Sequence, residues 1–303
     1  MIKSNSHIWE WQNLKVAWQV EGENIDSNCS TLLIHGFGAS KEHWRHNQKC
    51  YGSVNPCYAI DLIGFGESSQ PNANLTRNIN TENNFIYCFD SWSKQIVDFC
   101  TEIIKTPVLI VGNSIGGVIA LKASKLLDKQ CLGVVLIDCA QRTMDEKRLK
   151  EQSIGTRLLR PLIKNLVRQK WLSLNIFNAV ARPFFIKKIL EIAYPTKNNV
   201  DKSLIKILYE PTTRIGAPEA FRGFINLFND YLAPELMKDL NIKVYLIWGE
   251  KDPWESLDEA KEWQKSFPCI HSLDIIKDCG HCPHDENPER VNQIILKKIQ
   301  ASM

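Results

Sequence analysis

The chain lacks any apolar run long enough to cross a membrane, and it lacks a large excess of charge. No stretch of its 303 residues approaches the ~20 consecutive apolar residues that a spanning helix needs. The N-terminal segment has no unbroken apolar run and no small-residue cleavage site, so we expect no signal peptide. The net charge of +3 is too small to argue for a nucleic-acid partner. These absences predict a cytoplasmic protein that is not integral to a membrane.

Internal repeats and low-complexity linkers are also missing. The length suffices for one large domain with an insertion or for two domains. The ten cysteines do not form an obvious disulfide framework, because most stand singly inside apolar segments, as Cys57, Cys100, Cys131 and Cys139 do. In a reducing compartment such residues behave as small buried hydrophobes.

Apolar runs and segments with helical spacing alternate along much of the chain. Residues 7–11 and 14–20 alternate apolar and polar side chains, which predicts a hairpin at a sheet edge. Apolar runs at residues 30–37, 57–66 and 106–114 predict buried strands, and further strands are predicted at residues 133–140, 243–250 and 271–278. Helices are predicted at residues 91–104 with Asp90 as the cap, 115–127, 258–267 and 288–299. This order predicts an α/β fold, a mostly parallel central sheet with helices on both faces.

The alternation stops between residues 141 and 235, which contain helical, cationic and aromatic segments and no convincing buried strand. We therefore predict a core formed by residues 1–140 and 236–303, with a helical cap, residues 141–235, inserted into it. From Arg142 to Lys188 there are twelve Lys or Arg and three Asp or Glu, a net charge of +9.

Residues 158–172 of the cap have the pattern of one amphipathic helix, with Arg160, Lys164 and Arg168 on a cationic stripe. Two interpretations stay open. The helix can lie on an anionic membrane and admit a lipid tail, or it can pack its apolar face on the core and leave the basic residues in solvent. Amphipathicity alone does not distinguish them.

The sharpest motif is the run Gly112-Asn113-Ser114-Ile115-Gly116, which fits G-x-S-x-G between a predicted strand and a predicted helix. Glycines on both sides of the serine permit a turn too tight for side chains. Such a turn presents the Ser114 hydroxyl at the carboxyl edge of the sheet. The alternative is a plain glycine-rich turn, but the strand–turn–helix context favours a nucleophile.

A nucleophilic serine needs a base, and the base needs an acid that orients it. With this motif the acid and then the histidine follow the serine along the chain. Asp252 follows the strand predicted at 243–250, and His281 follows the last predicted strand. Asp138 is a rival acid at the end of an earlier strand, and His284 is a weaker candidate base.

His281 lies inside the sequence Cys279-Gly280-His281-Cys282, which has the spacing of a redox dithiol. A redox CxxC normally opens a helix after an early strand, whereas this one follows the last strand of a long sheet. A zinc site would need a full tetrahedral set of ligands, and no second ligand pair is apparent near His284. We therefore predict that His281 is a general base, that the cysteines are its neighbours, and that no metal or organic cofactor is used.

The oxyanion of an acyl-transfer reaction needs two backbone N–H donors. Ile115, directly after the nucleophile, should supply one of them. The loop after the first buried strand, where the sequence is His35-Gly36-Phe37-Gly38, should supply the other from Phe37. His35 and Asp61 are predicted to be structural loop residues.

With these residues the sequence resembles the α/β-hydrolase superfamily over nearly its whole length. It is also similar to the pheophytinase and chlorophyll dephytylase group of plants and cyanobacteria. The segments that carry this likeness are HGFGASKEHWRHN, AIDLIGFGESS, GNSIGG, EPTTRIGAPEAFRGFI, WGEKDPWE and GHCPHDENPE. The resemblance implies Ser114, Asp252 and His281 as a catalytic triad and makes the segment 282–284 a family loop. It implies hydrolysis of the phytyl ester of chlorophyll-type pigments, and it favours the membrane-surface interpretation of the cap.

The nucleophile restricts the reaction independently of the resemblance. A serine that attacked an alkyl carbon would leave an ether that activated water cannot cleave, so Ser114 favours acyl transfer. We expect a serine hydrolase that cleaves a lipophilic carboxylic ester through an acyl-enzyme, with peripheral contact to a thylakoid-type membrane. The alternatives are a general lipophilic esterase, a perhydrolase or a C–C hydrolase on the same triad, and a non-enzymatic membrane or pigment-binding module.

Overall fold

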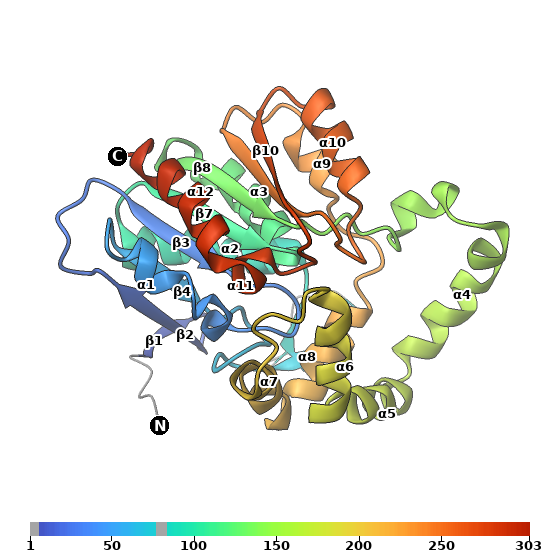
Figure 1. Cartoon of the computed structure of the whole chain (residues 1–303). Helices are drawn as coiled ribbons and strands as arrows, with labels where there is room; N and C mark the ends of the chain where they lie inside the picture. The colour runs from blue at the N-terminus through green and yellow to red at the C-terminus, as the bar shows by residue number, and fades with distance from the viewer. Residues whose placement is uncertain (1–5, 77–83) are drawn as a thin grey trace.

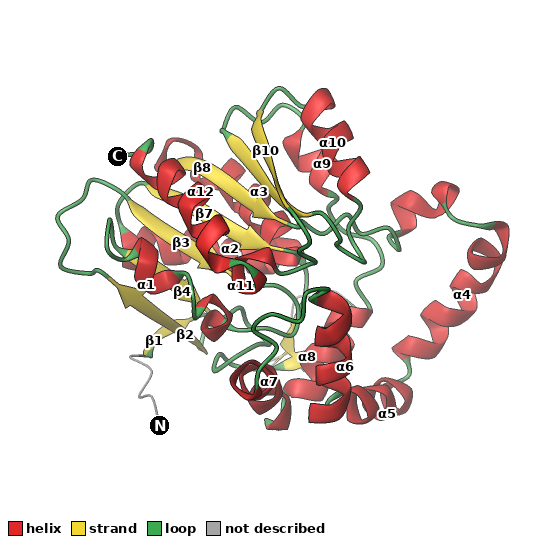
Figure 2. Cartoon of the chain, viewed as in Figure 1, coloured by secondary structure: helices red, strands yellow, loops and turns green. Residues whose placement is uncertain are grey.

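A mixed eight-stranded sheet forms the centre of the molecule, and helices cover both of its faces (Figures 1 and 2). The computed structural model describes residues 6–76 and 84–303. The strands of this sheet are β1 (His7–Trp11), β2 (Leu14–Glu21), β3 (Ser30–Ile34), β4 (Cys57–Ile60), β7 (Val108–Asn113), β8 (Cys131–Ile137), β9 (Val244–Gly249) and β10 (Ile270–Ile276). A separate short pair is formed by β5 (Asn72–Ala73) and β6 (Asn84–Phe85).

The strand order in the sheet is β1-β2-β4-β3-β7-β8-β9-β10. The hairpin β1–β2 and the pair β2–β4 are antiparallel, and every later pair is parallel. Strands β3 and β7 lie side by side near the centre, and all of their residues are buried. This agrees with their unbroken apolar sequences, because a central parallel strand has helices on both sides. The predicted α/β architecture is confirmed.

Two apolar clusters lie on opposite faces of the sheet. On one face pack α2 (Phe89–Phe99), α3 (Ile115–Leu127), α9 (Ala233–Met237) and α10 (Leu257–Ser266). On the other face pack α1 (Gln48–Tyr51) and α12 (Pro288–Gln300). Helix α11 (Pro283–Glu286) precedes α12. Because the parallel strands run in one direction, the loops after β3, β7, β8, β9 and β10 meet at one edge of the sheet.

Between β8 and β9 the chain is helical. It forms α4 (Ile154–Arg168), α5 (Lys170–Val180), α6 (Pro183–Ala193), α7 (Lys202–Tyr209), α8 (Ala217–Ile225) and α9. Helices α5 to α8 lie together beside the carboxyl edge of the sheet, and α4 lies at the periphery (Figure 1). Helix α9 packs on the core cluster. The division into core and cap at residues 141 and 235 stays a prediction. In the part of the chain that the structure describes, none of the helices is long and apolar enough to cross a membrane.

The residue predicted to cap the N-terminus of the first core helix, Asp90, is wrong. Helix α2 begins at Phe89, so Asp90 lies inside its first turn and pairs with Lys122 at 3.1 Å. The Phe89 N–H instead donates to the Asp230 carboxylate at 3.0 Å. A carboxylate distant in the sequence thus stabilises the start of α2, which a local pattern cannot show. The predicted C-terminal part, Cys100–Ile104, is a π-helix.

The single amphipathic helix predicted at residues 158–172 is also wrong, because the chain breaks at Gln169 between α4 and α5. Side chains of α8 and of the residue after it satisfy carbonyls at the end of α4. Asn226 donates to the Val167 carbonyl at 3.2 Å, and Arg222 donates to the Arg168 carbonyl at 3.5 Å. These contacts replace the intrahelical hydrogen bonds that a continuous helix would make.

Candidate active site

Ser114 occupies a strained turn between β7 and α3, with φ of 54° and ψ of −120°. A Cβ atom on Gly112 would lie 2.3 Å from the Gly116 carbonyl oxygen, and one on Gly116 would lie 2.4 Å from the Ile34 carbonyl oxygen. Both positions therefore require glycine, as the motif predicted. The turn is held by a hydrogen bond from the Ser114 N–H to the Ile137 carbonyl at 3.0 Å.

Asp252 and His281 meet at the same edge of the sheet, beyond β9 and β10. His281 Nδ1 lies 2.8 Å from Asp252 Oδ2. The other carboxylate oxygen accepts the Trp254 N–H at 2.8 Å and the Glu255 N–H at 3.1 Å. Burial alone would raise the pKa of Asp252, but the hydrogen bonds from His281 and from neighbouring groups hold it below its ordinary value. The ionised carboxylate can thus fix the tautomer of His281 that leaves Nε2 free to accept a proton.

Hydrogen bonds from one side chain to two backbone carbonyls bring the serine turn and the histidine loop together. The side-chain amide of Asn113 donates to the His281 carbonyl at 3.2 Å and to the Ile137 carbonyl at 3.1 Å. Asn113 therefore joins the turn that carries Ser114 to the loop that carries His281. A polar side chain beside the serine has a structural use here that the sequence pattern did not indicate.

The two predicted oxyanion donors lie on segments that touch Ser114. Ile115 is the first residue of α3, so its N–H has no acceptor within that helix. A Cβ atom on Gly36 would lie 3.2 Å from Ser114 Cβ, which places the loop of Phe37 against the serine. His35 is buried and shapes this loop, because it accepts the Leu62 N–H at Nε2 and donates from Nδ1 to the Gly36 carbonyl. Its structural role is as predicted.

Asp138, the rival acid, is fully buried behind Asp252. One of its oxygens accepts the Gly249 N–H at 2.9 Å. The other oxygen has no hydrogen-bond partner among the described residues. Burial, followed by the charge of Asp252, raises the pKa of Asp138 well above its ordinary value, which favours its neutral form. The structure pairs Asp252, and not Asp138, with His281.

Two further residues near His281 were not found from the sequence. The Trp254 ring meets the His281 ring edge to face at 4.9 Å. The Glu255 carboxylate accepts the Gln141 N–H at 2.7 Å, and burial raises its pKa to about 7. Trp254 and Glu255 lie two and three residues after Asp252, so their position near the acid was the available signal.

Cys279 and Cys282 are poorly suited to a redox or zinc site, and His284 is poorly suited to act as the base. Burial raises the pKa of Cys279 to about 12 and that of Cys282 well above its ordinary value. This opposes the thiolate form that a redox dithiol or a zinc site would need. His284 is fully buried against His43 and Trp44, and burial lowers its pKa well below the ordinary value.

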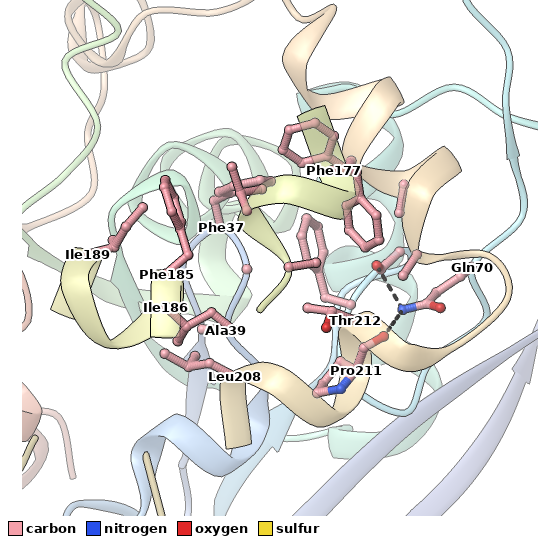
Figure 3. A pocket seen from close by; sticks show the side chains of 18 of the residues that line it. Phe37, Ala39, Gln70, Phe177, Phe185, Ile186, Ile189, Leu208, Pro211 and Thr212 are labelled. Atoms are coloured by element: carbon pink, nitrogen blue, oxygen red, sulfur yellow. Dashed lines mark hydrogen bonds between the residues drawn. The ribbon is translucent and has the colours of Figure 1, made fainter. Parts of the chain in front are cut away.

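Ser114 opens into a cavity of about 440 Å³ between the core and the cap helices (Figure 3). Gln70, Ser114 and Thr212 are the polar side chains that line it, and none of the described lining residues is charged. Gln70 joins the two parts of the chain, since its amide donates to the Gly64 carbonyl at 3.4 Å and to the Pro211 carbonyl at 3.3 Å. The rest of the wall is apolar and includes Phe37, Phe65, Phe177, Phe185, Ile189, Phe221 and Trp254.

The profile of the Alpha/beta hydrolase family matches residues 31–294, which contain the serine turn, the acid and the histidine. The chain belongs to this family. The strand–turn–helix setting of Ser114 fits the G-x-S-x-G motif of the α/β-hydrolase fold.

Three relatives of this hydrolase are informative. It is 27% identical to a chloroplastic pheophytinase of Arabidopsis thaliana over 96% of its own length, and it spans 65% of the length of that protein. It is 25% identical to the uncharacterized hydrolase YugF of Bacillus subtilis over 89% of each chain. Among solved structures, a bacterial membrane phospholipase A superposes with a TM-score of 0.72 at 24% identity, covering 98% of this chain and 86% of the other.

In this hydrolase the cap is fastened to the histidine loop. The His281 N–H donates to the Ala193 carbonyl at the end of α6, at 2.9 Å. Glu286 accepts the Gly280 N–H at 2.7 Å with one oxygen and the Thr196 N–H at 2.8 Å with the other. Helix α6 also lines the cavity. The position of His281 is thus coupled to the segment that forms the cavity wall.

Proposed function

We propose that the protein is a serine hydrolase that cleaves a lipophilic carboxylic ester through an acyl-enzyme. The single observation that carries the proposal is the pair His281–Asp252 at 2.8 Å, joined through Asn113 to a strained serine turn at an apolar cavity. In this proposal Ser114 Oγ attacks the ester carbonyl carbon while His281 Nε2 takes its proton. The N–H groups of Phe37 and Ile115 stabilise the negative oxygen of the tetrahedral intermediate.

The intermediate then collapses. The bond to the leaving oxygen breaks, His281 returns the proton to that oxygen, and the alcohol departs. Water attacks the acyl group on Ser114 with His281 again as the base, and the carboxylic acid leaves. Asp252 stabilises the histidine cation in both halves of the cycle and stays ionised, which agrees with its lowered pKa.

For the substrate we propose a phytyl ester of the chlorophyll or pheophytin type. The likeness to pheophytinase over 96% of the chain supports this choice. The lining of the cavity also supports it, because a wall without charged side chains suits an uncharged hydrocarbon arm. The same lining offers no counter-ion to an anionic substrate. A general lipophilic esterase, a perhydrolase and a C–C hydrolase would use the same triad and are separated by assay.

The first assay is release of phytol from chlorophyll a and pheophytin a in detergent, with Ser114→Ala as the matched control. A short p-nitrophenyl ester is assayed in parallel. We expect wild type alone to cleave all three compounds. Cleavage of the short ester without phytol release would leave the serine hydrolase in place and remove the pigment substrate. If wild type cleaved none of the three compounds and a fluorophosphonate did not label it, the proposal of a serine hydrolase would be refuted.

We also propose that the enzyme works peripherally at a membrane surface, to which the cap is the contact. A lipophilic ester is stored in membranes, and the cavity opens under the cap helices. The amphipathic residues of the cap support this arrangement.

A further inference from the structure

Helix α4 turns its apolar side outward. Its large aliphatic side chains are spaced to form one stripe, and all are exposed to solvent, with exposed fractions of 40 to 76%. They are Ile154, Leu158, Leu159, Leu162, Ile163 and Leu166. This is the reverse of the ordinary cap helix, which would bury these residues on the core.

The basic side of α4 faces the protein instead. Arg160 is buried, lies over the Phe228 ring at 4.8 Å and donates to the Met144 carbonyl. Lys164 pairs with Glu146 at 2.5 Å. Two of the three residues of the cationic stripe, Arg160 and Lys164, therefore hold α4 on the protein. The apolar side of α4 stays exposed.

Further large apolar residues are exposed on α5 and α6, the two helices that follow α4. Trp171 at the start of α5 is 61% exposed, and Phe184 and Ile192 on α6 are 73% and 57% exposed. Phe185 and Ile189 on α6 are 38% and 41% exposed and also line the cavity that contains Ser114. The exposed apolar surface thus reaches the wall of the site.

This surface carries positive charge. Residues 154–192 contain eight Lys or Arg and one Glu, a net charge of +7, so the remaining residues carry −4 of the total of +3. Arg157, Arg168 and Arg182 form no ion pair with an acidic residue in the described parts of the chain. Exposed apolar side chains together with three exposed arginines that have no described acidic partner match an anionic lipid surface. They do not match a second copy of this chain, because two such surfaces would repel each other.

We propose that the outward faces of α4 and α6 form a membrane-docking surface that inserts into an anionic lipid bilayer. Its residues are Ile154, Leu158, Leu159, Leu162, Ile163, Leu166, Trp171, Phe184 and Ile192, with Arg157, Arg168 and Arg182 at their edges. Docking needs no catalysis. That docking delivers an ester into the cavity past Phe185 and Ile189 rests on the proposed function.

The test is flotation of the protein with lipid vesicles, one set of phosphatidylcholine alone and one containing about one-third phosphatidylglycerol. Three variants are compared with wild type. Leu158→Ser/Leu162→Ser changes the docking surface, Leu126→Ser changes an equally exposed leucine on α3, and Ser114→Ala removes the proposed nucleophile. Leu158 and Leu162 do not line the cavity, so hydrolysis of a soluble short ester should be unchanged in the double variant.

We expect wild type, Leu126→Ser and Ser114→Ala to float with the anionic vesicles, and Leu158→Ser/Leu162→Ser to lose about tenfold or more in partitioning. Binding should weaken in salt and with neutral vesicles. Absence of wild-type binding, or equal binding by the double variant, would overturn the proposal. A wild-type dimer that the double variant converts to a monomer, without vesicle binding, would assign the face to a second copy instead. Failure of the ester assay with vesicle binding intact would refute the proposed function and leave the docking surface standing.

Discussion

Helices α3 and α4 are of similar length, 13 and 15 residues, and have opposite relations to the protein. Ten residues of α3 are buried, and they include both glycines of its first turn and every apolar side chain except Leu126. The one buried residue of α4 is Arg160, and its large aliphatic residues are exposed. The core helix is held by its own apolar surface, whereas the cap helix is held by charge and keeps its apolar surface free. We infer that α3 serves the fold and the nucleophile, and that α4 serves a partner outside the chain.

The largest expected effect lies at the start of α3. Ser114→Ala removes the proposed nucleophile and should lower kcat by about 10⁴-fold or more on any ester substrate. Thermal stability should change little, because alanine fits the space of serine, and the melting temperature checks this. A variant that kept wild-type kcat with the melting temperature unchanged would show that Ser114 is not the nucleophile and that the cavity serves another purpose.

A matched pair of glycines tests the comparison directly. Gly116→Ala on α3 would place a methyl group 2.4 Å from the Ile34 carbonyl oxygen and 2.7 Å from that of His35. The free energy of unfolding should fall by about 3 kcal/mol or more. Gly155→Ala on α4 meets no atom within 4 Å, and the higher helix propensity of alanine should raise stability by about 0.5 kcal/mol. Urea unfolding measures both, and similar effects at the two positions would contradict the difference in packing.

The same difference explains what the sequence could predict. The bounds of α3, residues 115–127, were predicted correctly. Its start is fixed by local geometry, the glycines around Ser114, and its apolar residues pack into the core against the sheet, α2 and α9. The amphipathic pattern of α4 was visible, but its orientation was not. The groups that hold its basic side, the Met144 carbonyl, Glu146 and Phe228, are brought together only by the fold.

The site divides in a similar way. Ser114, Asp252 and His281 could be proposed because each follows a strand whose apolar sequence is easily read. The raised pKa of Asp138 could not, because it depends on burial and on the nearby charge of Asp252. The Asp230 carboxylate at the start of α2 was missed for the same reason, since it is 141 residues from the N–H that it accepts.

The pH dependence of the free energy of unfolding should report on Glu255, which lies three residues after Asp252. The folded-state pKa of Glu255 is about 7, above its ordinary value of 4.5. The folded protein therefore holds more protons than the unfolded chain between these values, and stability is full below pH ~4.5 and falls as pH rises through ~7. Glu255→Gln should remove about 2 kcal/mol of this dependence. Unfolding by urea at several pH values measures it, and parallel curves for wild type and variant would mean that the Glu255 pKa is ordinary in the folded protein.

The smallest effect concerns Asp138, whose pKa burial and the charge of Asp252 raise well above its ordinary value. In Asp138→Asn the side chain is neutral, like the protonated acid, and can still accept the Gly249 N–H, so kcat/KM should stay within about threefold of wild type. Asp138→Gly suits the φ of 42° at this residue but leaves the Gly249 N–H without that acceptor. Because Gly249 ends β9 shortly before Asp252, we expect kcat/KM of this variant to fall by about tenfold.

The two variants separate a protonated Asp138 from an ionised one. If Asp138 acted as the charged partner of His281, asparagine would be as damaging as glycine, since both lack the charge. If Asp138 is a neutral acid, asparagine keeps the neutral side chain and the acceptor that glycine removes. Measurement of kcat/KM for both variants, with the melting temperature as a control for folding, distinguishes the two cases. An equal loss in both variants would contradict a neutral Asp138. A loss in Asp138→Gly alone would agree with a proton on Asp138 and the charge on Asp252, which is the arrangement that leaves His281 as the base.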